Sequence, residues 1–187
     1  MLIYKEPFPQ LKSPVSAVAL GTFDGLHRGH LTVIDAAVSE AHRLGGLAAV
    51  WCFASPPKNV FSPGSAEPLM SPDEKAAKLD AHGIDVLIMP APTPELLSMD
   101  ADDFLRSLAS SLRPSSVFCG YNFTFGKNAA GTPDVLSSSL TSEGIEVNVI
   151  PAVLTEDGTP VSSSLLRRRL ADGDDTSDLR AESYTNA

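Results

Sequence analysis

The chain has 187 residues, of which 43% are hydrophobic and 20% are charged, a balance typical of one soluble globular domain with a sizeable core. Its 14 basic and 23 acidic residues give a formal net charge of −9, which argues against general binding to nucleic acid or to anionic membranes. The sequence shows no apolar run of membrane-spanning length and no signal-peptide pattern. We therefore expect a cytoplasmic protein, in which Cys52 and Cys119 are buried free thiols.

The predicted elements alternate between strand and helix. Residues 1–14 are rich in proline and predict an irregular arm or edge segment, and residues 54–70 predict a long irregular loop. Strands are predicted at residues 15–20, 47–53, 85–89, 117–119 and 145–150, and helices at about 31–44, 71–83, 100–112, 132–141 and 164–172. This alternation predicts a doubly wound, Rossmann-like α/β fold, with a parallel sheet of about five strands and helices on both faces.

We expect residues 1–173 to form one domain and residues 174–187, which are polar and lack periodicity, to form a disordered tail. In a doubly wound fold, ligands bind at the carboxyl ends of the strands. Three candidate motifs follow predicted strands, after Leu20, Phe53 and Cys119, so they could converge on one cleft.

A turn of ten residues joins the first predicted strand to the first predicted helix. Its sequence is Gly21-Thr-Phe-Asp-Gly-Leu-His27-Arg-Gly-His30, and we call it the signature turn. Glycines let backbone amides approach a ligand, and a helix N-terminus attracts phosphate. His27 and His30 are three residues apart, so both rings would face one side of a first helical turn. A helix-entry loop with two surface histidines is the simpler explanation, but this combination favours phosphoryl or nucleotidyl transfer.

Two further segments carry candidate chemistry. In residues 161–167, serine hydroxyls precede Arg167 at a predicted helix start and could hold phosphate, although a Ser-capped helix with a solvated basic face explains them equally well. Residues 120–127, with Gly131 downstream, form an aromatic loop in which Asn122 could bind a heterocycle edge and the phenylalanines could stack on a planar ring. The alternative for that loop is a hairpin whose phenylalanines belong to the core.

These motifs resemble those of bacterial FAD synthetases, a branch of the H-x-G-H nucleotidyltransferase superfamily. The signature turn matches G-x-F-D-G-x-H-x-G-H, and residues 120–131 match G-x-[D/N]-F-x-F-G-x-x-x-x-G. Residues 161–167 resemble [I/V]-S-S-[T/S]-x-[I/L]-R, in family order. The stretch from Phe53 to Pro57 departs from the family's F-x-P-x-P, because Ser55 and Pro56 differ from it. The resemblance covers about residues 15–172.

The resemblance implies transfer of AMP from ATP to FMN, which gives FAD and pyrophosphate, by in-line attack of the FMN phosphate. By this resemblance, His27, His30 and Arg167 would be catalytic and would stabilise the triphosphate, together with Mg²⁺ held mostly by phosphates and water rather than by protein ligands. Nucleotide binding is then assigned to Gly21, Phe23, Gly29, Ser162, Ser163 and Ser164. Flavin binding is assigned to Asn122, Phe125, Phe53, Pro57 and Phe61.

Two other functions remain open. One is a related nucleotidyltransferase with another phosphorylated acceptor, such as phosphopantetheine, which would need no aromatic loop. The other is a non-catalytic flavin or nucleotide binder, which the intact His27, His30 and Arg167 argue against. Bifunctional members of the family continue into a riboflavin kinase module that this sequence lacks, so we expect no riboflavin kinase activity, whether the chain is a single-function enzyme or a fragment. The sequence does not indicate the oligomeric state.

Overall fold

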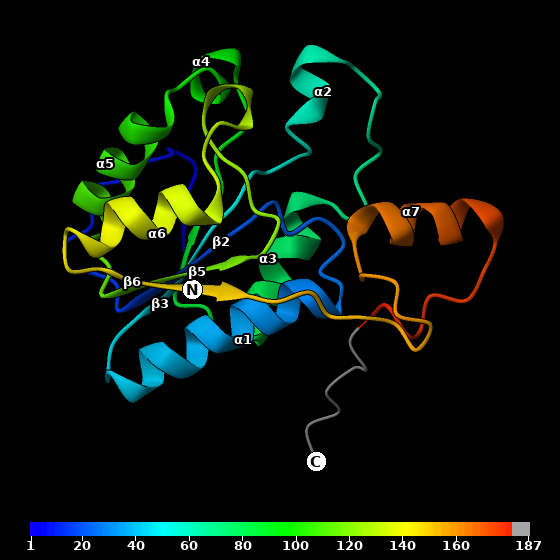
Figure 1. The fold of residues 1–187 in the computed structure, drawn as a ribbon, viewed down its shortest axis with the longest axis horizontal. Helices are drawn as coiled ribbons and strands as arrows, with labels where there is room; N and C mark the ends of the chain where they lie inside the picture. The colour runs from blue at the N-terminus through cyan, green and yellow to red at the C-terminus, as the bar shows by residue number, and fades with distance from the viewer. Residues whose placement is uncertain (181–187) are drawn as a thin grey trace.

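One parallel sheet organises the fold in the computed structural model, which describes residues 1–180 (Figure 1). Within those residues, six strands follow the order β1-β4-β3-β2-β5-β6, and every neighbouring pair is parallel. The strands are β1 (Leu2–Tyr4), β2 (Ala17–Leu20), β3 (Ala48–Trp51), β4 (Val86–Ile88), β5 (Ser116–Gly120) and β6 (Glu146–Ile150). The chain winds outward from β2 through β3 and then resumes at β5 on the other side of β2, so the strand order reverses between β2 and β5.

Four of the helices begin at a serine or threonine whose side chain caps the helix, as the capping rules favour. The helices are α1 (Arg28–Arg43), α2 (Lys58–Phe61), α3 (Pro72–Ala81), α4 (Pro94–Leu97), α5 (Ala101–Leu112), α6 (Pro133–Thr141) and α7 (Ser163–Asp172). Ser71 and Glu74 form a capping box at the start of α3, and Gly173 ends α7 in the left-handed conformation. The one-turn helix α2 lies in residues 54–70, which we predicted as an irregular loop, and the one-turn helix α4 lies in a stretch to which we assigned no element.

The sheet is covered on both faces, as predicted. Along β2, Ala17 and Ala19 pack in the core layer that contains α1 and α3. Val18 and Leu20 point the other way, into the layer that contains α5 and α6. The doubly wound fold is therefore confirmed, and strands buried on both faces explain the continuous apolar runs in the sequence.

Of the two alternatives predicted for residues 1–14, an irregular arm or an edge segment, the structure shows an edge element, since Leu2–Tyr4 forms β1 and pairs with Val86–Ile88 of β4. This pairing adds an edge strand to the five that we expected. β1 is short and largely exposed, and prolines follow it closely. Its strand conformation depends on the partner strand rather than on a local apolar pattern.

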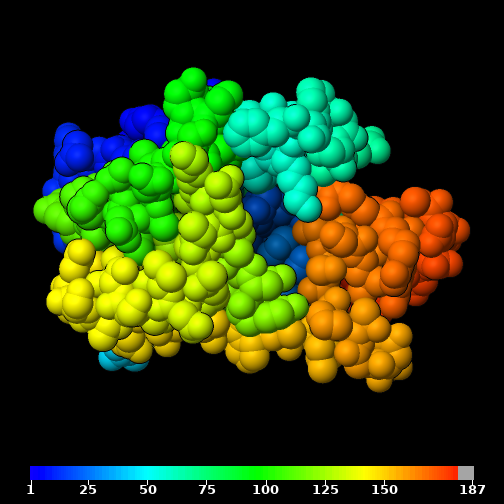
Figure 2. Space-filling view, turned by 45° about the horizontal axis from the view of Figure 1, so that its top comes forward, coloured from blue at the N-terminus to red at the C-terminus, as the bar shows by residue number. Residues whose placement is uncertain are grey.

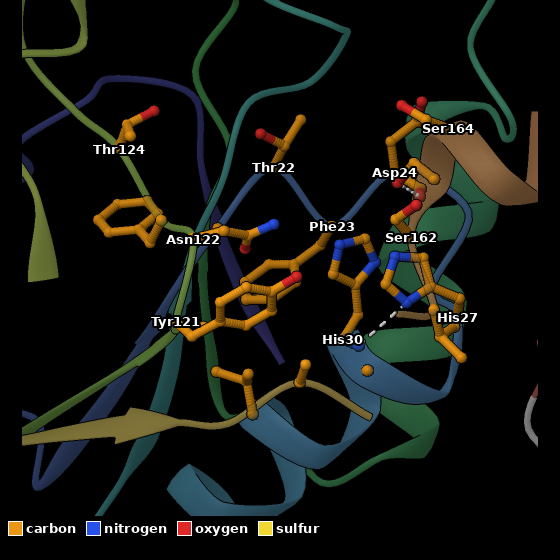
Figure 3. Close-up of a pocket in the computed structure, with 18 of the residues that line it drawn as sticks. Thr22, Phe23, Asp24, His27, His30, Tyr121, Asn122, Thr124, Ser162 and Ser164 are labelled. Carbon is orange, nitrogen blue, oxygen red and sulfur yellow. Dashed lines mark hydrogen bonds between the residues drawn. The ribbon is translucent and has the colours of Figure 1, made fainter. Parts of the chain in front are cut away.

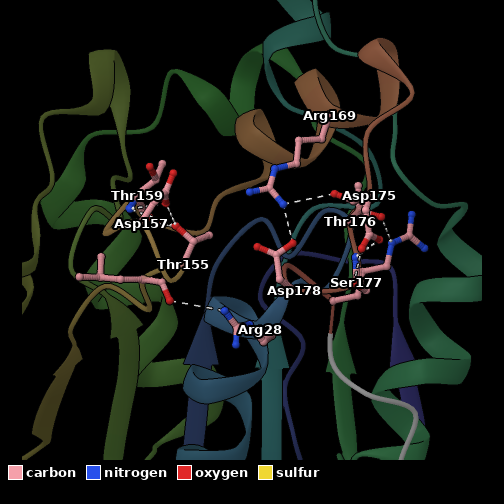
Figure 4. A network of polar contacts seen from close by, with 11 residues as sticks. Arg28, Thr155, Asp157, Thr159, Arg169, Asp175, Thr176, Ser177 and Asp178 are labelled. Carbon is pink, nitrogen blue, oxygen red and sulfur yellow. Dashed lines mark hydrogen bonds and ion pairs between the residues drawn. The ribbon is translucent and has the colours of Figure 1, made fainter.

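The segment after α7 folds back onto the start of α1. Leu179 is fully buried in a small core with Val161, Leu165 and Leu166, and its carbonyl accepts a hydrogen bond from the Arg28 amide at 2.9 Å. Figure 4 shows the polar network around this segment, in which the side chain of Arg169 on α7 pairs with Asp178 and donates to the Asp175 carbonyl. Residues 174–180, which we assigned to a disordered tail, thus form a packed turn, and residues 181–187 of that tail lie outside the described residues. Within residues 1–180, no helix is long and apolar enough to cross a membrane.

Candidate active site

A cleft opens beside the reversal of strand order between β2 and β5. Its cavity volume is about 460 Å³, within the range of small-molecule sites. In Figure 2 the signature turn, in blue, lies at the bottom of a hollow bounded by the loop after β5, the segment around α2 and the orange α7. The lining therefore comes from segments that are far apart in the sequence, at residues 20–33, 56–66, 120–124 and 150–167.

The signature turn is tight. Phe23 and Leu26 have positive φ angles of 48° and 39°, which are unusual for bulky residues, and both side chains are buried. Gly25 has a φ of 83°, and a Cβ atom there would lie only 2.7 Å from Cδ1 of Leu69. A Cβ at Gly21 would lie 2.7 Å from the Phe23 ring. These two glycines therefore allow the turn to fold against its own neighbours, and Gly21 also lines the cleft.

His27 and His30 form a stacked pair at the start of α1. The ring centroids are 3.6 Å apart and the ring planes differ by 18° (Figure 3). His27 is the N-cap residue, and its Nδ1 accepts a hydrogen bond from the His30 amide at 3.3 Å. Phe23 and His30 form a T-shaped ring pair, with centroids 5.3 Å apart and ring planes that differ by 87°. The expectation that both imidazoles face one side of the first turn is confirmed.

Both imidazoles are neutral at physiological pH. Burial lowers the pKa of His27 from 6.5 to about 4. Burial lowers the pKa of His30 well below its ordinary value, and the nearby His27 and Lys75 lower it further. Nδ1 of His30 is buried without a hydrogen-bond partner among the described residues. Because a neutral imidazole still donates one N–H, the pair can bind phosphate oxygens without carrying a buried charge beforehand.

Asp24 joins three parts of the cleft wall. Its side chain is 5% exposed and pairs with the guanidinium of Arg167 on α7. The other carboxylate oxygen accepts from the Leu69 amide at 3.0 Å, and the Asp24 carbonyl accepts from the Ser163 hydroxyl at 2.8 Å. Nε of Arg167 donates to the Glu67 carbonyl at 2.9 Å. Our candidate residues did not include Asp24, although its place in the F-D-G part of the signature turn was a signal for it.

The N-terminus of α7 faces the same cleft as that of α1. Ser162 caps α7 by accepting from the Leu165 amide at 3.2 Å, so its hydroxyl already has a structural role. Two helix N-termini at one cleft provide a positive potential suited to phosphate. All residues predicted for catalysis and nucleotide binding line the cleft: His27, His30, Arg167, Gly21, Phe23, Gly29, Ser162, Ser163 and Ser164.

The residues predicted for flavin binding are only partly brought together. Asn122 and Pro57 line the cleft. Phe53 and Phe125 lie outside its lining. Phe125 is 7% exposed and belongs to the core, and the half-buried Phe53 packs against that core through Trp51, with ring centroids 5.0 Å apart.

Phe61 also lies outside the cleft lining, and its side chain on α2 is 65% exposed. In place of these phenylalanines, Tyr121 and Phe123 of the aromatic loop line the cleft beside Asn122, and Figure 3 shows Tyr121 and Asn122 on the side opposite His27. The aromatic loop thus contributes to the cleft, but through different rings from those we predicted.

The family model of FAD synthetase matches residues 10–165 of this chain, which include the signature turn and the aromatic loop. The chain belongs to the FAD synthetase family. It is 31% identical over 162 residues to the bifunctional riboflavin kinase/FMN adenylyltransferase of Bacillus subtilis strain 168, and the match covers 85% of this chain and 50% of that protein. The chain therefore spans about half the length of this FAD synthetase relative.

Solved structures support the fold. A macrolide-efflux protein from Streptococcus pneumoniae superposes with a TM-score of 0.80 at 25% identity, covering 93% of this chain and 59% of that one. Pantothenate synthetase from Thermus thermophilus superposes with a TM-score of 0.55 at 17% identity, covering 88% of this chain and 72% of that one. At such low identity the likeness concerns the fold alone, and it supports the α/β architecture with one parallel sheet.

Proposed function

We propose that this member of the FAD synthetase family is an FMN adenylyltransferase, which transfers AMP from ATP to FMN and releases pyrophosphate. One observation carries the proposal: segments of three family motifs, the signature turn, the aromatic loop and the start of α7, line a single cleft. The net charge of −9 supports small-molecule substrates rather than nucleic acid, and we propose a cytoplasmic location.

The triphosphate of ATP binds, in this proposal, between the N-termini of α1 and α7. An oxygen of the FMN phosphate attacks the α-phosphorus, and the bond from that phosphorus to the oxygen bridging the α- and β-phosphates breaks, so pyrophosphate leaves with the bonding electrons. No covalent enzyme intermediate is needed. His27, His30 and Arg167 stabilise the charge that develops on the phosphates through N–H donors that are already in place.

Mg²⁺ enters this proposal with ATP. Among residues 1–180, no group of three or more His, Cys, Asp or Glu side chains is arranged to hold a metal ion, and the Asp24 carboxylate is engaged by Arg167. The donors in the cleft suit phosphate rather than a hard cation. When bound to the phosphates and water, the ion would neutralise charge on the triphosphate.

The flavin ring, in this proposal, lies between the aromatic loop and the loop that contains Pro57. Tyr121 and Phe123 offer flat apolar surface, and Asn122 offers both a donor and an acceptor for a heterocycle edge. A flexible phosphorylated chain such as phosphopantetheine has no use for such a platform, so these residues favour FMN over that acceptor.

The test is a chromatographic assay in which the protein is incubated with Mg²⁺, ATP and one acceptor at a time. FAD formed from FMN supports the proposal. An adenylylated product formed from phosphopantetheine but not from FMN would assign the chain to the alternative transferase. Binding of FMN and ATP without any product would instead make it a non-catalytic binder.

A further inference from the structure

Lys75 lies in the interior, behind the wall of the cleft. It is part of α3, and only 2% of its surface is exposed. Its Nζ donates to the Thr22 carbonyl at 3.1 Å and to the Phe53 carbonyl at 2.9 Å. Thr22 belongs to the signature turn, and Phe53 follows β3, so the ammonium connects the chain at the carboxyl ends of two adjacent strands.

This ammonium has no carboxylate partner among residues 1–180, since the ion pairs there do not include Lys75. Lysine is rarely buried without such a partner, because burial of an unbalanced charge is costly. The charge acts on the cleft wall, where it contributes to the lowered pKa of His30. A triphosphate bound against the signature turn would supply the missing negative charge.

We propose that Lys75 is a positioning residue of the triphosphate site, which fixes the signature turn through the Thr22 carbonyl and supplies a buried positive charge that the bound triphosphate balances. This inference rests on the proposed function, because it requires an anionic ligand at the signature turn. Lys75 does not line the cleft, so it acts through the turn and through its electric field rather than by touching substrate.

A solely structural role for Lys75 would be to fill the space under the turn and satisfy two carbonyls. That role predicts no effect of its charge on ligand affinity or on His30. The two roles are separated by Lys75→Met, which keeps the length of the side chain and removes the charge. Lys78→Met is the matched control, because Lys78 lies on the same helix and is exposed.

The experiment measures binding of inorganic tripolyphosphate and of ATP by calorimetry in the wild type and both variants. Lys75→Met is expected to weaken tripolyphosphate binding about tenfold or more, and Lys78→Met to leave it unchanged. NMR titration of the histidine rings gives a second measurement. The charged and titratable groups that act on His30 are His27 and Lys75, so Lys75→Met is expected to raise the pKa of His30.

The outcomes separate the two proposals. If the wild type binds neither tripolyphosphate nor ATP, the proposed function fails and this inference falls with it. If the wild type binds but folded Lys75→Met has wild-type affinity and an unchanged His30 pKa, only the inference about Lys75 is overturned. If Lys75→Met does not fold, the ¹⁵N resonance of Lys75 Nζ in the wild type decides: a shift on addition of tripolyphosphate supports the inference, and an unchanged resonance overturns it.

Discussion

The carboxylate of Asp24 holds the guanidinium of Arg167 at the edge of the cleft, so the arginine proposed to stabilise the triphosphate already has a partner within the protein. Nε of Arg167 is also occupied, by the Glu67 carbonyl. A guanidinium has five N–H donors, and those left over can bind a ligand without any change of rotamer. The ion pair therefore orients Arg167 before the substrate arrives, which lowers the entropic cost of binding.

Replacing Asp24 tests this orientation. Asp24→Ala would leave the Leu69 amide without its acceptor and Arg167 without its counter-ion, so we expect a loss of about 2 kcal/mol in the free energy of unfolding. Asp24→Asn keeps an acceptor for the Leu69 amide and should lose less. Urea unfolding compares the two variants, and equal stability of Asp24→Ala and the wild type would contradict this account.

The proposed catalytic role of His27 can be tested separately from its role as the N-cap of α1. Asparagine is a strong N-cap residue, so His27→Asn should keep the stability of α1 while removing the imidazole. His27→Ala should lose about 1 kcal/mol of stability as well. If His27 stabilises the developing charge, turnover should fall about 10²-fold or more in both variants. Turnover close to that of the wild type in folded His27→Asn would restrict His27 to capping.

Stability should depend on pH through the same histidines. Folded His27 has a pKa of about 4 and an unfolded histidine about 6.5, so between these values the unfolded chain binds more protons. The free energy of unfolding should therefore rise with pH across this window, and this contribution is complete above about pH 6.5. For His27 the difference corresponds to about 3 kcal/mol, and His30 acts in the same direction.

Urea unfolding at several pH values measures this dependence. His27→Asn should show a smaller loss of stability than the wild type on acidification through the window. A wild-type free energy of unfolding that stays constant between about pH 6.5 and pH 4 would show that the histidines are not buried in neutral form.

Much of the fold and of the site was predictable because the sequence patterns that indicate them involve residues close together in the chain. The capping box at Ser71 and the continuous apolar run of β2 depend only on neighbouring residues. The cleft residues of the signature turn were also predictable, because three glycines and two histidines within one strand-to-helix turn favour a ligand site. The serines before α7 fit a helix cap equally well, and it was the resemblance to the family motif that assigned them to the site. That the segments after Leu20 and Cys119 meet followed from the parallel topology. The place of residues 161–167 at the same cleft followed from the family resemblance.

Local sequence patterns did not predict which aromatic rings line the cleft and which pack in the core. In the loop after β5, Phe123 and Phe125 both fit either a core or a ligand, and the sequence does not fix which ring turns inward. Phe125 packs in the core because Gly131 leaves room for it: a Cβ at that position would lie 2.5 Å from the ring. Lys75 has the sequence context of a surface lysine, and its burial follows from the packing of α3 under the signature turn.

Replacing Gly29 tests whether phosphate approaches the backbone closely at the start of α1. A Cβ there would lie 3.3 Å from the His27 ring and 3.6 Å from the Val161 carbonyl, so Gly29→Ala fits with only a small shift. Alanine favours a helix over glycine by up to about 1 kcal/mol, and we expect the variant to be at least as stable as the wild type. Turnover should nevertheless fall about tenfold or more, because the methyl group displaces His27 and blocks phosphate from the backbone. Full activity in steady-state assays would contradict a phosphate position beside Gly29.

The most direct test of the central claim follows the transferred atom. The protein is incubated with Mg²⁺, FMN and ATP radiolabelled at the α-phosphorus, and the products are separated by chromatography. We predict that the label appears in FAD, that pyrophosphate forms in equal amount, and that His30→Ala slows the formation of both products by about 10²-fold or more. Label that stays in ATP, or that appears in AMP without FAD, would contradict it.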